Sequence, residues 1–212
     1  MSGKNTLSNR TQFQIDRIAF FSDAVIAIAI TLLTLEIKIP EFGTNASWVQ
    51  IKAEYGQTLT RQLAALLICF WTIGSLWIRH HELYEYIINI DLKIIKVNLY
   101  FLFSIILMPL AVSFLFGNNP LQLKLIVFFT DLFSCNFFYF ILLLIVFRSR
   151  NNFSSIQSGK KINKMKTTGL LTAIVFLVVC VLVLLNIEHF YYPLFLLPLY
   201  RFYCYGKSIF KR

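Results

Sequence analysis

Residues 17–39 read RIAFFSDAVIAIAITLLTLEIKI, and from Ala24 to Leu33 this stretch is apolar apart from Thr31. An apolar block of roughly 18 or more residues is typical of a membrane-spanning helix. The block is too long for the core of a signal peptide, and no convincing cleavage site follows it. Pro40 and Gly43 then end the segment. Residues 17–39 therefore predict a retained transmembrane helix.

Five further apolar blocks follow this segment in the chain of 212 residues. Helices in lipid satisfy their own backbone polar groups, and these blocks lack the period of two of a barrel strand. The sixth block is interrupted by Pro193, Pro198 and Arg201. The sequence predicts an all-α integral membrane protein, with one six-helix transmembrane domain over residues 1–212 and no separate soluble domain. Its helices are expected near 17–39, 60–86, 97–116, 121–147, 168–187 and 189–206.

The composition supports a membrane protein and gives its orientation. Hydrophobic residues make up 58% of the chain and charged residues 14%, against about a quarter charged in soluble domains. The net charge of +10 is not accompanied by basic runs interleaved with exposed aromatics, so nucleic acid is not an expected partner. Of the 20 Lys and Arg residues, only Lys38, Lys52, Arg61 and Lys124 fall on one side of the predicted membrane. The positive-inside rule therefore places both termini in the cytoplasm.

Signatures of enzymes and metal sites are missing from the sequence. No G-x-S-x-G, H-E-x-x-H or glycine-rich phosphate loop occurs, so an enzyme is not expected. The four cysteines lie singly, without C-x-x-C spacing. His80 and His81 are adjacent, and adjacent helical positions point about 100° apart. We expect neither a metal site nor a cofactor, and we interpret Asp131 and the Glu188–His189 pair as packing or interfacial residues.

A polar cluster marks the start of the first predicted helix. Arg17, Ser22 and Asp23 lie near its cytoplasmic end, and an acidic side chain inside a membrane helix normally needs a partner. Arg17 lies on a different face from Asp23, so a group from another helix is the better candidate. Trp77 and the two histidines of the second predicted helix are the expected hydrogen-bond partners of Ser22 and Asp23. The simplest interpretation is that Asp23 only pins two helices together.

A stripe of four residues on the same helix points to a second role. These residues recur at offsets 0, 4, 7 and 11 and fall within roughly a 60° arc at about 100° per residue. Copies of such a helix can face each other around an axis. The ring of aliphatic side chains with one hydroxyl layer would suit a narrow pore with a hydrophobic gate. On the stripe alone, however, ordinary helix packing is the better explanation, because almost any apolar helix offers such a stripe. The stripe consists of Ala24, Ile28, Thr31 and Leu35.

Two motifs in these helices resemble the transmembrane protein 175 family of potassium channels. The first is Arg17-x-x-x-Phe21-Ser22-Asp23, which runs on through the mostly apolar residues 24–33 to Leu35-Glu36-Ile37. The second, shorter motif is Trp77-x-x-His80-His81 in the second predicted helix. Beyond that helix the resemblance extends only to hydropathy and helix count.

The resemblance implies a single-repeat bacterial form in the plasma (inner) membrane that assembles as a homotetramer among membrane lipids. It implies conduction of potassium and other monovalent cations, with potassium as the permeant species. It also implies a pore with a hydrophobic constriction, lined by the first helix at Ile28, Thr31 and Leu35, with Leu32 nearby. The remaining motif residues would form a structural polar network that holds the first helix in place: Arg17, Ser22, Asp23, Trp77, His80 and His81.

The alternative to a channel is a proton- or ion-coupled secondary transporter. Such a protein would use intramembrane titratable groups, here Asp23, His80 and His81, as a relay. A channel passes unitary current steps, whereas a transporter gives a slow, saturable flux. Electrical recording therefore separates the two functions.

Overall fold

The computed structural model describes residues 2–37, 47–148, 153–154, 156 and 159–197. Five long α-helices and two short 3-10 helices account for nearly all of these residues. The only pairing of β type in this part of the chain is an isolated bridge between Ile87 and Ser154. The elements are α1 (Ser2–Leu32), η1 (Leu33–Glu36), α2 (Trp48–Tyr84), α3 (Leu92–Phe116), α4 (Leu121–Val146), α5 (Lys160–Leu184) and η2 (Tyr192–Phe195).

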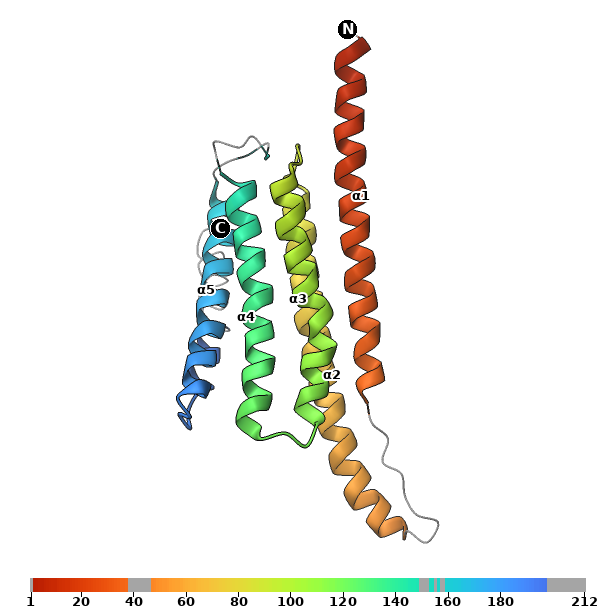
Figure 1. The fold of residues 1–212 in the computed structure, drawn as a ribbon, viewed down its shortest axis with the longest axis vertical. Coiled ribbons are helices and arrows are strands. Elements are labelled where there is room, and N and C mark those ends of the chain that lie inside the picture. Colours follow the sequence, from red (N-terminus) through yellow and green to blue (C-terminus); the bar gives the residue numbers. More distant parts are fainter. Residues whose placement is uncertain (1, 38–46, 149–152, 155, 157–158, 198–212) are drawn as a thin grey trace, which may run out of the picture.

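The helices form an up-and-down bundle in which α3 has a central place (Figure 1). α3 packs along α4 on one side and against α1 on the other, while α2 contacts α1, α3 and α4. α5 packs on α4 and ends the row. The N-terminal part of α1 extends past the other helices, as does the start of α2 at the opposite end. α1 therefore lies at an edge of the bundle, with one side packed and the other open.

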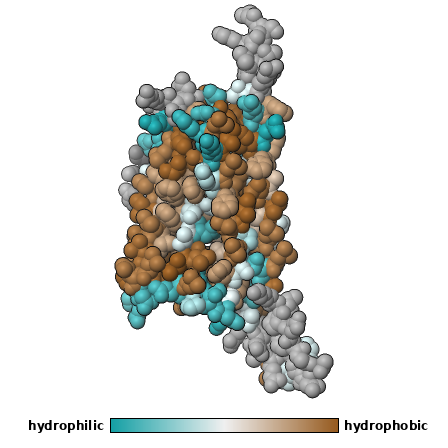
Figure 2. Space-filling view, in the orientation of Figure 1, coloured by the Kyte–Doolittle hydropathy of each residue, from teal (hydrophilic) through white to brown (hydrophobic). Residues whose placement is uncertain are grey.

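The surface of the bundle suits lipid. Five helices among the described residues are long and apolar enough to cross a membrane. Figure 2 shows a broad hydrophobic zone around the middle of the visible face, with hydrophilic side chains at both of its ends. Large apolar side chains are exposed on the membrane-spanning helices, among them Leu67 and Trp71 on α2 and Phe103 on α3. The prediction of an all-α protein with several membrane-spanning helices is confirmed.

The helices begin and end at other residues than the sequence predicted. α1 begins at Ser2 rather than near 17, α2 at Trp48 rather than near 60, α3 at Leu92 rather than near 97, and α5 at Lys160 rather than near 168. Hydropathy marks only the part of a helix that crosses lipid, and each of these helices continues into polar sequence outside that part. The fourth helix, predicted over 121–147, matches α4 closely.

The end of the first helix also differs from the prediction. α1 gives way at Leu33 to the 3-10 helix η1, before the expected end near 39. The Thr31 hydroxyl donates to the Ile28 carbonyl at 2.8 Å, and the Thr34 hydroxyl donates to the Thr31 carbonyl at 2.7 Å. Hydroxyl bonds of this kind compete with the backbone ladder, and helix ends commonly tighten into 3-10 geometry.

The sixth helix is not found at its predicted start. Residues 188–191 form turns, Pro193 sits in the short helix η2, and α-helical backbone resumes only at Leu196 and Leu197. Proline lacks the amide hydrogen that an uninterrupted helix needs. Residues 198–206 of this predicted helix lie outside the described residues, so the structure supports five transmembrane helices, and the sixth stays a prediction.

Candidate functional site in the first helix

Two opposite sides of α1 and of its continuation η1 have different surroundings. One side packs against the bundle, and its four members are at most 2% exposed. We call this the anchor face: Ser22, Ile26, Ala29 and Leu33. The stripe defined above has the same spacing on the opposite side, and all four of its residues are exposed. Ile28 is 58% exposed and Leu35 75%, while Leu32 beside them is 37% exposed.

A buried chain of hydrogen bonds fixes the anchor face to α2 and α3. The Asn98 amide nitrogen on α3 donates to the Ser22 hydroxyl at 2.9 Å. The His80 Nε2 atom on α2 lies 2.8 Å from the Asn98 amide oxygen. An amide oxygen can only accept, so Nε2 carries the proton and donates. Ser22, His80 and Asn98 are all at most 2% exposed, and in lipid such groups need partners within the protein.

Aromatic rings hold His80 in this position. Its ring stacks on Phe101 of α3 with the centroids 5.1 Å apart and the planes 8° from parallel, and it also packs on Tyr84 of α2. The orientation of the imidazole is thereby fixed from two helices. The chain from Ser22 through Asn98 to His80 links all three of the first helices at one depth.

Asp23 belongs to a separate and more exposed pair. The Trp77 indole nitrogen donates to an Asp23 carboxylate oxygen at 2.8 Å. The His81 ring packs on the Trp77 ring with 5.7 Å between centroids. Trp77 is therefore the partner of Asp23, while His80 is linked to Ser22 through Asn98. His80 and His81 face different surroundings, and no group of three or more metal-binding side chains exists among the described residues.

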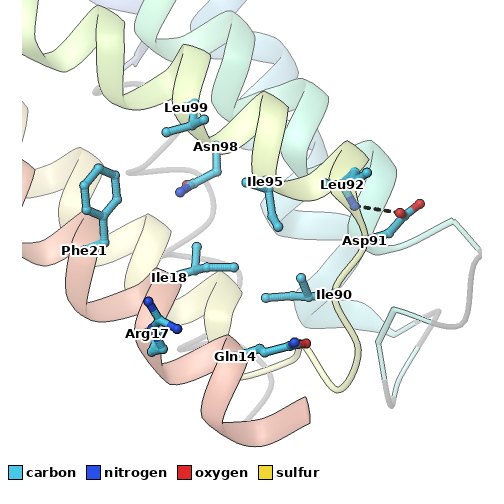
Figure 3. Close-up of a pocket in the computed structure, with 10 residues that line it drawn as sticks. All are labelled: Gln14, Arg17, Ile18, Phe21, Ile90, Asp91, Leu92, Ile95, Asn98 and Leu99. Carbon is cyan, nitrogen blue, oxygen red and sulfur yellow. Dashed lines mark hydrogen bonds between the residues drawn. The ribbon is translucent and has the colours of Figure 1, made fainter. Parts of the chain in front are cut away.

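Arg17 lies apart from both of these groups. Its guanidinium lies 5.9 Å from the centre of the Phe13 ring on the same helix. The side chain lines a pocket of about 550 Å³ between α1 and the start of α3. Figure 3 shows Arg17 there with Gln14 and Ile90, while Asn98 lies deeper along the same wall. The six residues expected to form one network thus fall into two groups, with Arg17 apart from both. Ser22 is linked to His80 through Asn98, and Asp23 bonds to Trp77, on which His81 packs.

Asn98 is the functional residue that the sequence motifs missed. It lies on α3, beyond the second motif, where the resemblance noted from the sequence extends only to hydropathy and helix count. A single asparagine within an apolar block is itself informative, because a buried amide must find hydrogen-bond partners. That criterion would have singled out Asn98 and also Asn136, which is 2% exposed on α4.

The family comparison covers this same set of residues. The family model described as the endosomal/lysosomal potassium channel TMEM175 matches residues 17–109. The match includes the stripe, the anchor face and every member of the two hydrogen-bonded groups, Asn98 included. Residues 17–109, a little under half of the chain, thus match the TMEM175 family.

Curated relatives named as potassium channels match a similar share of the chain. A potassium channel from Chryseobacterium sp. is 33% identical over 108 residues, which cover 49% of this chain and 52% of the relative. A potassium channel from Streptomyces collinus is 35% identical over 94 residues, 44% of this chain and 43% of the relative. The chain thus spans about half the length of the curated relatives that it matches.

A solved TMEM175 structure shares the fold over a longer stretch. The crystal structure of a lysosomal potassium-selective channel TMEM175 homolog from Chamaesiphon minutus has a TM-score of 0.72 at 22% identity. The superposition covers 88% of this chain and 95% of that one. The fold therefore extends through α4 and α5, whereas the family model ends within α3.

A second polar group joins Arg79 of α2, which the family model covers, to two residues of α4 that lie beyond it. Arg79 Nη2 donates to the Asn136 side-chain oxygen at 3.1 Å, and the Tyr139 hydroxyl donates to the Arg79 carbonyl at 3.1 Å. The Arg79 guanidinium lies 5.1 Å from the centre of the Tyr139 ring. This group holds the end of α2 against the bundle and thereby supports the position of His80, the next residue in the chain.

Proposed function

We propose that this protein is a potassium-permeable cation channel whose pore is lined by α1. The exposure of the stripe on a helix anchored by its opposite side is the observation that carries the proposal. The matched relatives are named potassium channels, which supports a channel and speaks against an enzyme. Conduction would involve potassium and other monovalent cations, and no cofactor is needed for it.

A homotetramer would turn the stripe into a pore. One exposed stripe cannot enclose an axis, but copies of α1 arranged around an axis would bring the stripes face to face. Ile28 would then narrow the pore to a hydrophobic constriction that excludes water. Leu32 and Leu35 would extend the apolar wall on the outer side. The anchor face and its hydrogen bonds would keep each copy of α1 at a fixed distance from the axis.

Thr31 would supply the polar layer in this pore. Its hydroxyl proton is engaged with the Ile28 carbonyl, while the hydroxyl oxygen keeps lone pairs that can accept or coordinate. Since the residue is exposed on the stripe, a ring of these oxygens could replace part of the water shell of a cation. Potassium gives up its shell more readily than sodium does, so such a ring would favour potassium.

The orientation follows from the basic residues. We place the N-terminus and the ends of the helices around the loops before α3 and α5 in the cytoplasm, because Arg79, Lys93 and Lys96 flank the first loop and six Lys and Arg residues lie in or just after the second. A cytoplasmic C-terminus also needs the predicted sixth helix, and the resemblance suggests the plasma membrane. Ile88 in the first of these loops donates its amide hydrogen to the Phe153 carbonyl in the second at 2.9 Å. The two loops therefore lie at the same end of the bundle, as this orientation requires.

A coupled transporter is the less supported alternative. A relay through Asp23 and His80 would require a path between them, yet Asp23 bonds to Trp77 while His80 bonds to Asn98. These bonds satisfy the two groups separately. The arrangement suits a structural role for both residues.

Single-channel recording tests the proposal. The purified protein would be reconstituted in planar bilayers under a gradient of potassium against sodium. Discrete current steps that reverse toward the potassium potential are the expected result. A slow, saturable flux without steps, from protein of verified assembly, would favour the transporter.

A further inference from the structure

Asp131 is a buried carboxyl group that the proposed pore does not use. It lies on α4 and is 7% exposed, and neither carboxylate oxygen has a hydrogen-bond partner. Ten residues separate it from Leu121 at the start of α4, which is roughly 15 Å along the helix. The hydrocarbon core is about 30 Å thick, so Asp131 lies near the middle of the membrane. An ionisable residue at that depth is costly and marks a functional site by default.

The surroundings of Asp131 offer no counter-charge. It lines a pocket of about 330 Å³ between α3 and α4, where α3 contributes Leu107, Leu110 and Ala111. No Lys, Arg or His lines that pocket. Arg79 of α2 bonds to Asn136 and lies on the Tyr139 ring.

The titratable groups that face Asp131 are thiols. Cys135, one turn further along α4, and Cys69 of α2 are both buried in this part of the bundle. Cys180 of α5 is linked to the neighbouring Thr130 hydroxyl at 3.8 Å. Thiols that are buried in an apolar environment stay neutral, so they do not compensate a negative charge.

We propose that Asp131 is a proton-binding site inside the membrane, at the wall of the pocket between α3 and α4. A proton is the one cation that needs neither space nor a set of oxygen ligands. The Ser134 hydroxyl, one turn further along α4, is already bonded to the Thr130 carbonyl, and the described residues hold no cluster of three potential metal ligands. The protonated carboxyl group removes the charge that no neighbour balances. This inference is independent of potassium conduction.

The binding of a proton makes Asp131 a chemical modification site. A hydrophobic carbodiimide dissolves in the membrane and reacts with protonated carboxyl groups in apolar surroundings. The acid proton passes to one nitrogen of the reagent while the carboxylate oxygen adds to its central carbon. The acyl group then migrates to nitrogen and leaves a stable N-acylurea, so the product carries one whole reagent molecule and nothing is released.

The experiment is carbodiimide labelling of the full-length protein in lipid, followed by peptide mass mapping. Asp131 is expected to be labelled at acidic pH, with a rate that falls by about tenfold per pH unit once the proton is lost. Asp23, whose carboxylate accepts a bond from Trp77, serves as the internal control and should label far less. Asp131→Asn should abolish the label at this peptide, and Asp23→Asn should leave it unchanged.

Three outcomes would overturn the proposal. They are absence of label at Asp131 in folded protein, a rate that does not change with pH, and protection by potassium or sodium at constant pH. Protection by either ion would mean that a metal cation, and not a proton, occupies the site. Because the mapping is done on the wild-type chain, the test decides the question even where Asp131→Asn fails to fold.

Discussion

The two sides of α1 show how one helix can serve packing and function at the same spacing. The anchor face is closed by α2 and α3, and its only polar member, Ser22, accepts a bond from Asn98. The stripe has a similar apolar character but is exposed in the single chain, and its only polar member, Thr31, bonds to its own helix. The two sides carry similar side chains, and they differ in whether α2 and α3 pack against them.

This comparison separates stability from conduction. A substitution on the anchor face changes contacts that hold the chain together, so it is expected to act on the free energy of unfolding. A substitution on the stripe changes a surface that the fold does not need. Four changes, ordered by their expected effect on stability, test whether the two sides are as independent as their contacts indicate.

The largest loss of stability is expected for Ile26→Asn on the anchor face. Ile26 is 1% exposed, so the change removes buried apolar contacts and places an amide where no partner is available. We expect the free energy of unfolding to fall by about 3–5 kcal/mol. Thermal unfolding in detergent measures the loss. Ile28→Asn is the matched control, and an equal loss in that variant would contradict the separation of the two sides.

The next effect is expected for Asn98→Ala on α3. This change removes the link between Ser22 and His80 and leaves both of their polar groups buried without that partner. The expected cost is about 1–3 kcal/mol. Thermal unfolding beside Asn163→Ala, which truncates an exposed asparagine on α5, provides the comparison. If the two variants unfold at the same temperature, the buried chain does not hold α1.

The structure around Ile26 can be predicted from the sequence to a greater extent than the structure around Asn98. The segment around Ile26 is recognisable as a membrane helix from composition, because lipid imposes one requirement on every residue of a spanning segment. The partner of Ser22 is not recognisable in the same way. Asn98 is 76 residues away, and only the packing of α3 beside α1 brings it there.

The bounds of the helices show the same division. Hydropathy located the lipid-crossing parts but not the polar extensions of α1, α2, α3 and α5, since helices outside lipid depend on local bonds rather than on apolar length. Trp77, His80 and His81 were predicted as a set of partners for Ser22 and Asp23, and the structure assigns Trp77 to Asp23 and leaves Arg17 apart. Nor could the sequence separate the stripe from ordinary packing, because exposure depends on which neighbours α1 has.

A smaller effect is expected from the bond between Trp77 and Asp23. Trp77 is 39% exposed, and hydrogen bonds between membrane helices average about 0.6 kcal/mol, with a maximum near 1.7 kcal/mol. Trp77→Phe removes the indole donor and keeps a ring that can pack on His81. A double-mutant cycle with Asp23→Asn, followed by thermal unfolding, isolates the coupling. A coupling above about 2 kcal/mol would mean that this pair holds α1 as firmly as the buried chain does.

The smallest effect on stability, and the clearest effect on function, is expected for Ile28→Asn. Surface substitutions usually change stability by at most about 0.5 kcal/mol, and Ile28 is 58% exposed in the single chain. In the proposed tetramer the same change would wet the constriction and raise the single-channel conductance severalfold, because water and hydrated ions could then occupy it. Recordings of the variant beside the wild-type protein measure this increase. Unchanged conductance in a folded, assembled Ile28→Asn variant would remove Ile28 from the pore, while a loss of assembly without a change in monomer stability would show that the stripe is a contact between copies rather than a channel wall.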